Sequence, residues 1–116
     1  MTTAYELSNR ALTATKLLGD TELVIVAEGP VAAAYDAYHG RNEAESLEEE
    51  CRTRADDYET AQYEHDDAAE AVLDSVPEGC ELNEEHNTAI AAHRAARDAC
   101  REASAMWRTM ANEEEK

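Results

Sequence analysis

The feature that most constrains this chain is a stripe of ten positions without an acid inside a strongly acidic segment. Thirteen Asp and Glu residues lie between Glu43 and Asp74. In a heptad pattern that starts at Ala44, the a and d positions are Ala44, Leu47, Cys51, Arg54, Tyr58, Ala61, His65, Ala68, Val72 and Ser75. Acids that avoid one stripe at helical spacing indicate a helix that packs along this stripe. We therefore predict a helix over residues 42–76 instead of a disordered acidic segment.

A second stripe follows after a short turn. Pro77 and Gly79 lie between the two stripes, and both residue types terminate helices. The second stripe consists of Leu82, His86, Ala89, His93, Ala96, Cys100, Ala103, Trp107 and Met110. It predicts a helix over residues 83–112, which must run antiparallel to the first because the turn is short.

This antiparallel register predicts which side chains meet across the hairpin. It places His65 beside His93 and Tyr58 beside Cys100. Alanines from both helices meet in the middle and allow the helix axes to approach closely. The larger side chains Leu47, Trp107 and Met110 are expected to fill the far end.

The first 41 residues predict shorter helices that pack on the hairpin. Residues 3–18 have apolar residues on one helical face, and Gly19 is a typical helix stop. Residues 21–28 fit a short helix or a strand by pattern alone, and we favour the helix because a single strand has no partner here. Pro30 is expected to start another helix that Gly40 ends. Asn42 and Glu45 form a plausible capping pair for the long helix.

The predicted fold is thus an all-α bundle built on a long antiparallel helical hairpin. We expect a single domain over residues 1–116, with N-terminal helices in 1–41, the hairpin in 42–112 and a frayed tail in 113–116. The thin alanine seam leaves open whether a second copy of the chain completes it as a homodimer.

The net charge of −17 is concentrated in one segment. Residues 43–85 carry a net charge of −15, whereas the remaining parts are close to neutral. This charge disfavours direct binding to nucleic acid or to an anionic membrane, since both require a basic surface. The longest apolar run, Leu23 to Ala27, is too short to span a membrane, and the N-terminus lacks a signal-peptide pattern. We expect a cytoplasmic protein whose three cysteines are free thiols.

No pattern typical of an enzyme, a cofactor site or a metal site is found. The four glycines are isolated, so no phosphate-binding loop is expected. A metal site between helices requires a Glu three residues before each histidine, but Gln62, Asn83 and Ile90 occupy these positions. The carboxylates lie on an open helix surface where nothing separates the pKa values of neighbouring acids. We therefore expect a non-enzymatic protein without cofactor or metal.

The density of acids suggests imitation of a nucleic-acid backbone. A helix from Glu43 to Asp74 is about 48 Å long and carries a carboxylate about every 4 Å, close to the phosphate spacing of about 3.4 Å along one DNA strand. In size, acidity and helix content the chain resembles phage-type decoy proteins that block restriction or CRISPR complexes, although it shares no motif with them. The resemblance implies an inhibitor whose partner is a basic nucleic-acid-binding protein or complex.

Two alternatives remain open at this point. The chain is also consistent with a scaffolding hairpin whose acids only solvate it, or with an ordinary acidic protein of a salt-adapted host. Exposed tyrosines beside acids often anchor protein partners. The candidate partner-binding residues are Tyr35, Tyr38, Glu45, Glu48, Glu49, Asp56, Asp57, Glu59, Tyr63, Glu64, Asp67 and Glu70.

Overall fold

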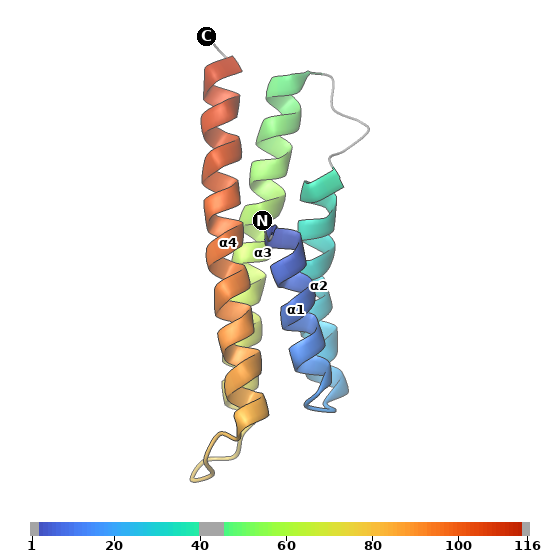
Figure 1. The fold of residues 1–116 in the computed structure, drawn as a ribbon, viewed down its shortest axis with the longest axis vertical. Coiled ribbons are helices and arrows are strands. Elements are labelled where there is room, and N and C mark those ends of the chain that lie inside the picture. The colour runs from blue at the N-terminus through green and yellow to red at the C-terminus, as the bar shows by residue number, and fades with distance from the viewer. Residues whose placement is uncertain (1–2, 40–45, 115–116) are drawn as a thin grey trace.

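The computed structural model describes residues 3–39 and 46–114, which form four α-helices. These are α1 (Ala4–Lys16), α2 (Thr21–His39), α3 (Leu47–Asp74) and α4 (Glu84–Glu114). The long helices α3 and α4 run antiparallel. The shorter α1 packs beside the half of them nearest the turn that joins α3 to α4, and α2 extends further along α3 (Figure 1), where Arg54 donates a hydrogen bond to the Tyr38 carbonyl. The bundle measures 55 × 25 × 21 Å. The prediction of an all-α bundle built on an antiparallel hairpin is confirmed.

Each helix of the bundle has two main neighbours. The packed pairs are α3 with α4, α2 with α3, α1 with α4, and α1 with α2. Figure 1 shows the α1–α2 turn and the α3–α4 turn at the same end of the molecule, while α3 and α4 continue beyond α1 at the other end. A long stretch of α3 therefore lies between two neighbouring helices, whereas its beginning has fewer neighbours.

The ends of the long helices differ from the predicted bounds. Ser46 is the N-cap of α3 and accepts a hydrogen bond from the Glu49 backbone N–H at 3.1 Å, so this helix begins at residue 47 and not at 42. The predicted capping pair of Asn42 and Glu45 lies outside the described residues. α4 begins after Asn83, whose side chain accepts from the His86 backbone N–H at 2.8 Å. It continues to residue 114, so the helix extends into the segment that was predicted to fray.

The start and end of α1 follow from local sequence signals. Thr3 and Glu6 form a capping box, in which each side chain accepts from the other residue's backbone N–H. Gly19 follows the helix with a φ of +74°, a left-handed conformation that favours glycine. The predicted helix and its stop are confirmed, with bounds two residues or fewer from the prediction at each end.

The prediction of two separate helices in residues 21–39 was wrong, because α2 is continuous through Gly29 and Pro30. Pro30 removes one backbone hydrogen bond, but the residue is fully buried on the same face of α2 as Ala27, Ala34 and Ala37. Gly29 allows α2 to approach α3 closely, since a Cβ at this position would lie 3.1 Å from Glu64 Oε2. The Gly-Pro pair thus shapes a helix interface and does not end a helix.

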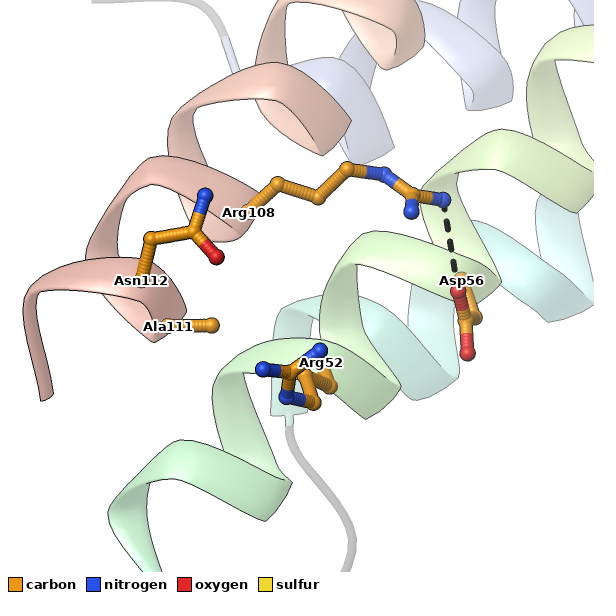
Figure 2. A pocket seen from close by; sticks show the side chains of 5 residues that line it. All are labelled: Arg52, Asp56, Arg108, Ala111 and Asn112. Atoms are coloured by element: carbon orange, nitrogen blue, oxygen red, sulfur yellow. Dashed lines mark hydrogen bonds and ion pairs between the residues drawn. The ribbon is translucent and has the colours of Figure 1, made fainter. Parts of the chain in front are cut away.

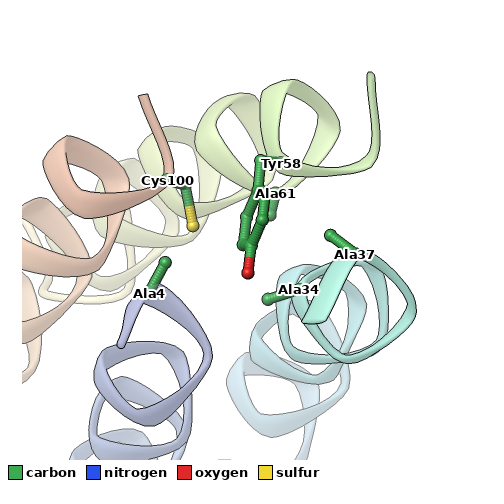
Figure 3. Packing of buried hydrophobic residues seen from close by; sticks show 6 residues of the cluster. All are labelled: Ala4, Ala34, Ala37, Tyr58, Ala61 and Cys100. Carbon is green, nitrogen blue, oxygen red and sulfur yellow. The ribbon is translucent and has the colours of Figure 1, made fainter. Parts of the chain in front are cut away.

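The core consists largely of alanine around a few larger side chains. Figure 3 shows the Tyr58 ring pointing from α3 into the space between α1 and α2, surrounded by small side chains. This cluster contains Ala4, Ala34, Ala37, Tyr58, Ala61 and Cys100. Alanine permits close helix axes at little cost in side-chain entropy, which explains how a chain without Phe fills its core.

The buried stripe of α4 departs from the heptad register beyond Cys100. Ser104 and Ala111 are buried there, whereas Met110 is 38% exposed. A straight α-helix has 3.6 residues per turn, so a stripe spaced at 3.5 shifts sideways by about 20° per heptad. Leu47 is 52% exposed as well, and the expectation that Leu47 and Met110 fill the far end was therefore wrong.

Candidate functional site

The acids in the first half of α3 (residues 47–60) are largely paired with arginines. Glu48 contacts Arg52 at 3.0 Å, and Glu50 contacts Arg54 at 2.7 Å, each one turn apart on the helix. From α4, Arg108 pairs with two further acids, Asp56 at 3.3 Å and Glu59. Three of these acids, Glu48, Asp56 and Glu59, are predicted partner-binding residues, and they thus already have cationic partners within the chain. Glu49, the next predicted site residue, is exposed.

These pairs border a shallow pocket between α3 and α4. Its volume is about 250 Å³, and its lining residues are Arg52, Asp56, Arg108, Ala111 and Asn112 (Figure 2). Figure 2 shows the Arg108 side chain reaching across from α4 to Asp56 on α3. The pocket is open, and its charged groups neutralise one another, so its chemistry is that of a surface ion-pair network.

The second half of α3 (residues 61–74) presents acids of a different kind. Asp67, Glu70 and Asp74 are exposed and form no ion pair within the described part of the chain. Asp66 pairs with Arg97 of α4 at 3.0 Å. Glu70 lies in the same groove as this pair. The predicted site residues Asp67 and Glu70 are thus the ones that keep their negative charge uncompensated.

Further exposed acids continue from this half of α3 around the turn end of the bundle. Asp74 shares a groove with Asp20 and Glu22 at the start of α2. The acids beyond the helix, in the turn and the first turn of α4, are Glu78, Glu81, Glu84 and Glu85, all of them exposed. We call the exposed set of Asp67, Glu70, Asp74, Glu78, Glu81, Glu84, Glu85 and Glu22 the turn-end acidic surface.

The last six of these residues were missing from the predicted site, although a signal exists for all of them except Glu22. Between Ala55 and Glu85 the sequence contains no Lys or Arg at all. Beyond its first few residues, an acid in this stretch has no base within one helical turn of it in the sequence, and within the described part of the chain Asp67, Glu70 and Asp74 form no ion pair. A search for segments without bases would have extended the predicted site past Glu70.

Two predicted site residues do not lie on the outer surface as expected. Asp57 and Glu64 are half-buried, because α3 packs against α2 as well as against α4. The Oε2 atom of Glu64 is buried beside Gly29 and accepts no hydrogen bond. Burial, together with the neighbouring charge of Asp67, raises the pKa of the Glu64 carboxyl. Glu45 lies outside the described residues.

The three predicted tyrosines divide into a cluster and a single ring. Tyr63 is 59% exposed on the outer face of α3, as predicted. Tyr35 and Tyr38 are about half-exposed and pack with Tyr5 and His39 at ring-centroid distances of 4.2–6.3 Å. The rings fill the space between one another, so the cluster offers a surface and not a cage for a ligand.

Beneath the surface, two histidines meet in the core as the register predicted. His65 Nδ1 lies 3.0 Å from His93 Nδ1, and both residues are fully buried. Their outer nitrogens contact hydroxyls of α1, with His65 Nε2 2.8 Å from Ser8 Oγ and His93 Nε2 2.7 Å from Thr15 Oγ1. Burial lowers the pKa of His65 to about 3, with a further contribution from His93, and lowers the pKa of His93 to about 4. Both imidazoles are therefore neutral at pH 7.

The part of the chain that the structure describes contains no group of three or more metal-ligating side chains suited to hold an ion. Burial raises the pKa of the Cys100 thiol to about 11, which makes it unreactive. None of the four described helices is long and apolar enough to cross a membrane. Comparison with protein-family models, with curated proteins and with solved structures finds no match for this chain.

Proposed function

We propose that this protein binds a basic nucleic-acid-binding protein or complex, and that its acidic surface competes there with DNA or RNA. The observation that supports the proposal is the turn-end acidic surface, in which exposed carboxylates continue from the end of α3 through the turn to the first turn of α4 and form no ion pair among the described residues. Such a surface resembles a phosphate backbone in charge and releases counterions when a basic partner binds. It does not bind nucleic acid directly, because like charges repel.

The ion pairs refine where the partner binds. Acids that already pair with arginines, such as Asp56 and Glu59, gain less from a basic partner because that partner must displace Arg108. In the second half of α3 and the adjoining turn, Asp66 pairs with Arg97, but the other exposed acids form no such pair among the described residues. We therefore assign the contact to the turn-end acidic surface and not to the full length of α3.

The proposal is tested by capture from a host lysate with and without added duplex DNA, at about 50 mM and about 500 mM salt. The wild-type protein is compared with two triple charge reversals, Asp67→Lys/Glu70→Lys/Asp74→Lys and Glu48→Lys/Asp56→Lys/Glu59→Lys. We expect partners that are released by DNA and by salt, and that are lost only with the first triple variant. Capture that resists both competitors, or equal loss with both variants of unchanged helicity, would contradict the proposal.

A second candidate function is a protein-interaction scaffold, which the exposed cluster around Tyr35 and Tyr38 favours. Half-exposed aromatic rings held together in one patch are typical of protein contact sites. The scaffold predicts that alanine at Tyr35, Tyr38 or Tyr63 abolishes capture, with little dependence on salt and no competition by DNA. The same capture experiment therefore distinguishes the two functions.

A further inference from the structure

The buried histidines belong to a continuous row of hydrogen-bond contacts through the core. The row begins and ends at backbone carbonyls of α1 and passes through two hydroxyls and two imidazoles. Its five contacts are Ala4 O to Ser8 Oγ (3.0 Å), Ser8 Oγ to His65 Nε2 (2.8 Å), His65 Nδ1 to His93 Nδ1 (3.0 Å), His93 Nε2 to Thr15 Oγ1 (2.7 Å), and Thr15 Oγ1 to Ala11 O (2.8 Å). All four side chains are fully buried.

With neutral imidazoles, this row has fewer protons than contacts. Each hydroxyl and each neutral imidazole supplies one proton, which gives four donors for five contacts. If every bond is donated in the direction from Thr15 toward Ala4, Thr15 donates to His93 and its contact with the Ala11 carbonyl is not a hydrogen bond. If every bond is donated in the opposite direction, Ser8 donates to His65 and therefore forms no hydrogen bond with the Ala4 carbonyl. A third arrangement makes both terminal bonds but sets two nitrogen lone pairs against each other at 3.0 Å.

We propose that this row is a proton-binding site of capacity one, which accepts a single proton while the bundle stays folded. One proton from solvent turns the pair into an imidazole and an imidazolium that share one N–H between their Nδ1 atoms. The row then has five donors for five contacts. Each of the two α1 hydroxyls accepts a hydrogen bond from a histidine and donates one to a carbonyl of its own helix. A second proton would place two N–H groups and two cations face to face, so the rings must separate.

The surroundings set the pH range of this uptake. The two helices that flank the row contribute no charged group to it: α1 contributes Ser8 and Thr15, and the buried residues of α2 are Leu23, Ala27, Pro30, Ala34 and Ala37. On α4, the neutral Cys100 thiol lies 3.9 Å from Ser8 Oγ. On α3, Tyr58 is buried two turns from His65 and is neutral, since burial raises its pKa. The carboxyl that precedes His65 in sequence is that of the half-buried Glu64, whose Oε2 atom lies beside Gly29 of α2. None of the fully buried residues in the described part of the chain is an acid. Uptake therefore begins only well below the ordinary pKa of histidine.

The test is an acid titration of the folded protein with nitrogen-15-labelled histidine, followed by NMR, alongside circular dichroism. We expect one uptake step that changes both rings together, with an Nδ1–H signal shared between them and with unchanged helicity. A second uptake should coincide with loss of helicity. Imidazoles that stay neutral until the helices melt, or two separate uptake steps in the folded bundle, would overturn the proposal.

A matched pair of variants adds an independent test. Thr15→Val removes one hydroxyl without changing side-chain size, which leaves three protons for three contacts in the neutral row. The N–H group that the added proton forms at His93 Nε2 then has no acceptor, so the pH of the uptake step should fall by roughly one to two units. Thr13→Val is the control, because the exposed Thr13 hydroxyl only bonds the Asn9 carbonyl of its own helix. An unchanged uptake step in folded Thr15→Val protein would contradict the proposal.

Discussion

The first half of α3 contains six acids, and the second half contains five. Their surroundings differ much more than their numbers. In the first half, Arg52, Arg54 and Arg108 approach the acids, so the surface there is a mixed ion-pair network. From Tyr58 onward, α1 and α2 complete a four-helix core, and among the described residues Arg97 is the base that pairs with an acid of the second half. One acidic helix thus presents two different surfaces, because the neighbouring helices determine which of its acids have a cationic partner.

The largest expected effect tests whether the second half is the better-packed one. Ala61 belongs to a cluster with residues of α1, α2 and α4, so Ala61→Glu buries an unpaired charge among four helices. We expect a loss of about 3–5 kcal/mol in the free energy of unfolding, measured by urea denaturation. Ala55→Glu, at a buried position of the first half, should cost less because its charge reaches solvent near the end of the bundle. Thr60→Glu, which is exposed, serves as the control, and equal losses for all three variants would contradict the assigned packing.

The next largest effect is a loss of stability at low pH, which we expect because the core beside the second half contains two buried histidines. The pKa values of His65 and His93 in the fold, about 3 and about 4, lie below the unfolded value of 6.5. The unfolded chain therefore binds more protons, so stability is fully present above pH 6.5 and is lost as the pH falls from 6.5 toward 4. The loss is about 3 kcal/mol for each imidazole that remains neutral in the fold.

This prediction is measured as a difference, because the surface acids also titrate in this range. The reference is His65→Gln/His93→Gln, whose core side chains form hydrogen bonds but do not gain protons. Wild type should lose more stability than this variant between pH 6.5 and 4 in urea denaturation. Parallel pH profiles of the two proteins would show that the histidines do not contribute.

The smallest effect is expected at the ion pairs that distinguish the first half. Arg108→Ala removes the partner of both Asp56 and Glu59, but the three side chains are exposed enough for water and salt to screen the pairs. We expect a loss of no more than about 1 kcal/mol, which declines further as salt is added. Arg94→Ala is the control, since Arg94 is exposed and forms no ion pair within the described residues. A larger loss that persists at high salt would show that the first half is held by its charges.

Much of the fold could be predicted because hydrophobic spacing reports directly on helix packing. The stripe free of acids predicted α3, the Pro-Gly turn predicted the reversal, and the resulting register placed His65 opposite His93. Gly29 and Pro30 misled the prediction, since the same residues that break an exposed helix also suit one that packs closely. Ser8 and Thr15 were missed, although Ala4, Ser8, Ala11 and Thr15 share one helical face and all are buried.

By itself the sequence determined the helical class, the hairpin and the concentration of charge, because each depends on spacing along one chain. The tertiary structure decided which acids are neutralised, which are half-buried and which remain exposed. The sequence pattern identifies the residues of a helix that lie in its packing stripe. The partners of the residues that flank this stripe depend on which neighbouring helix packs beside them. Glu64 beside α2, Asp56 beside Arg108 and Asp67 in solvent are acids of one helix that differ for this reason alone.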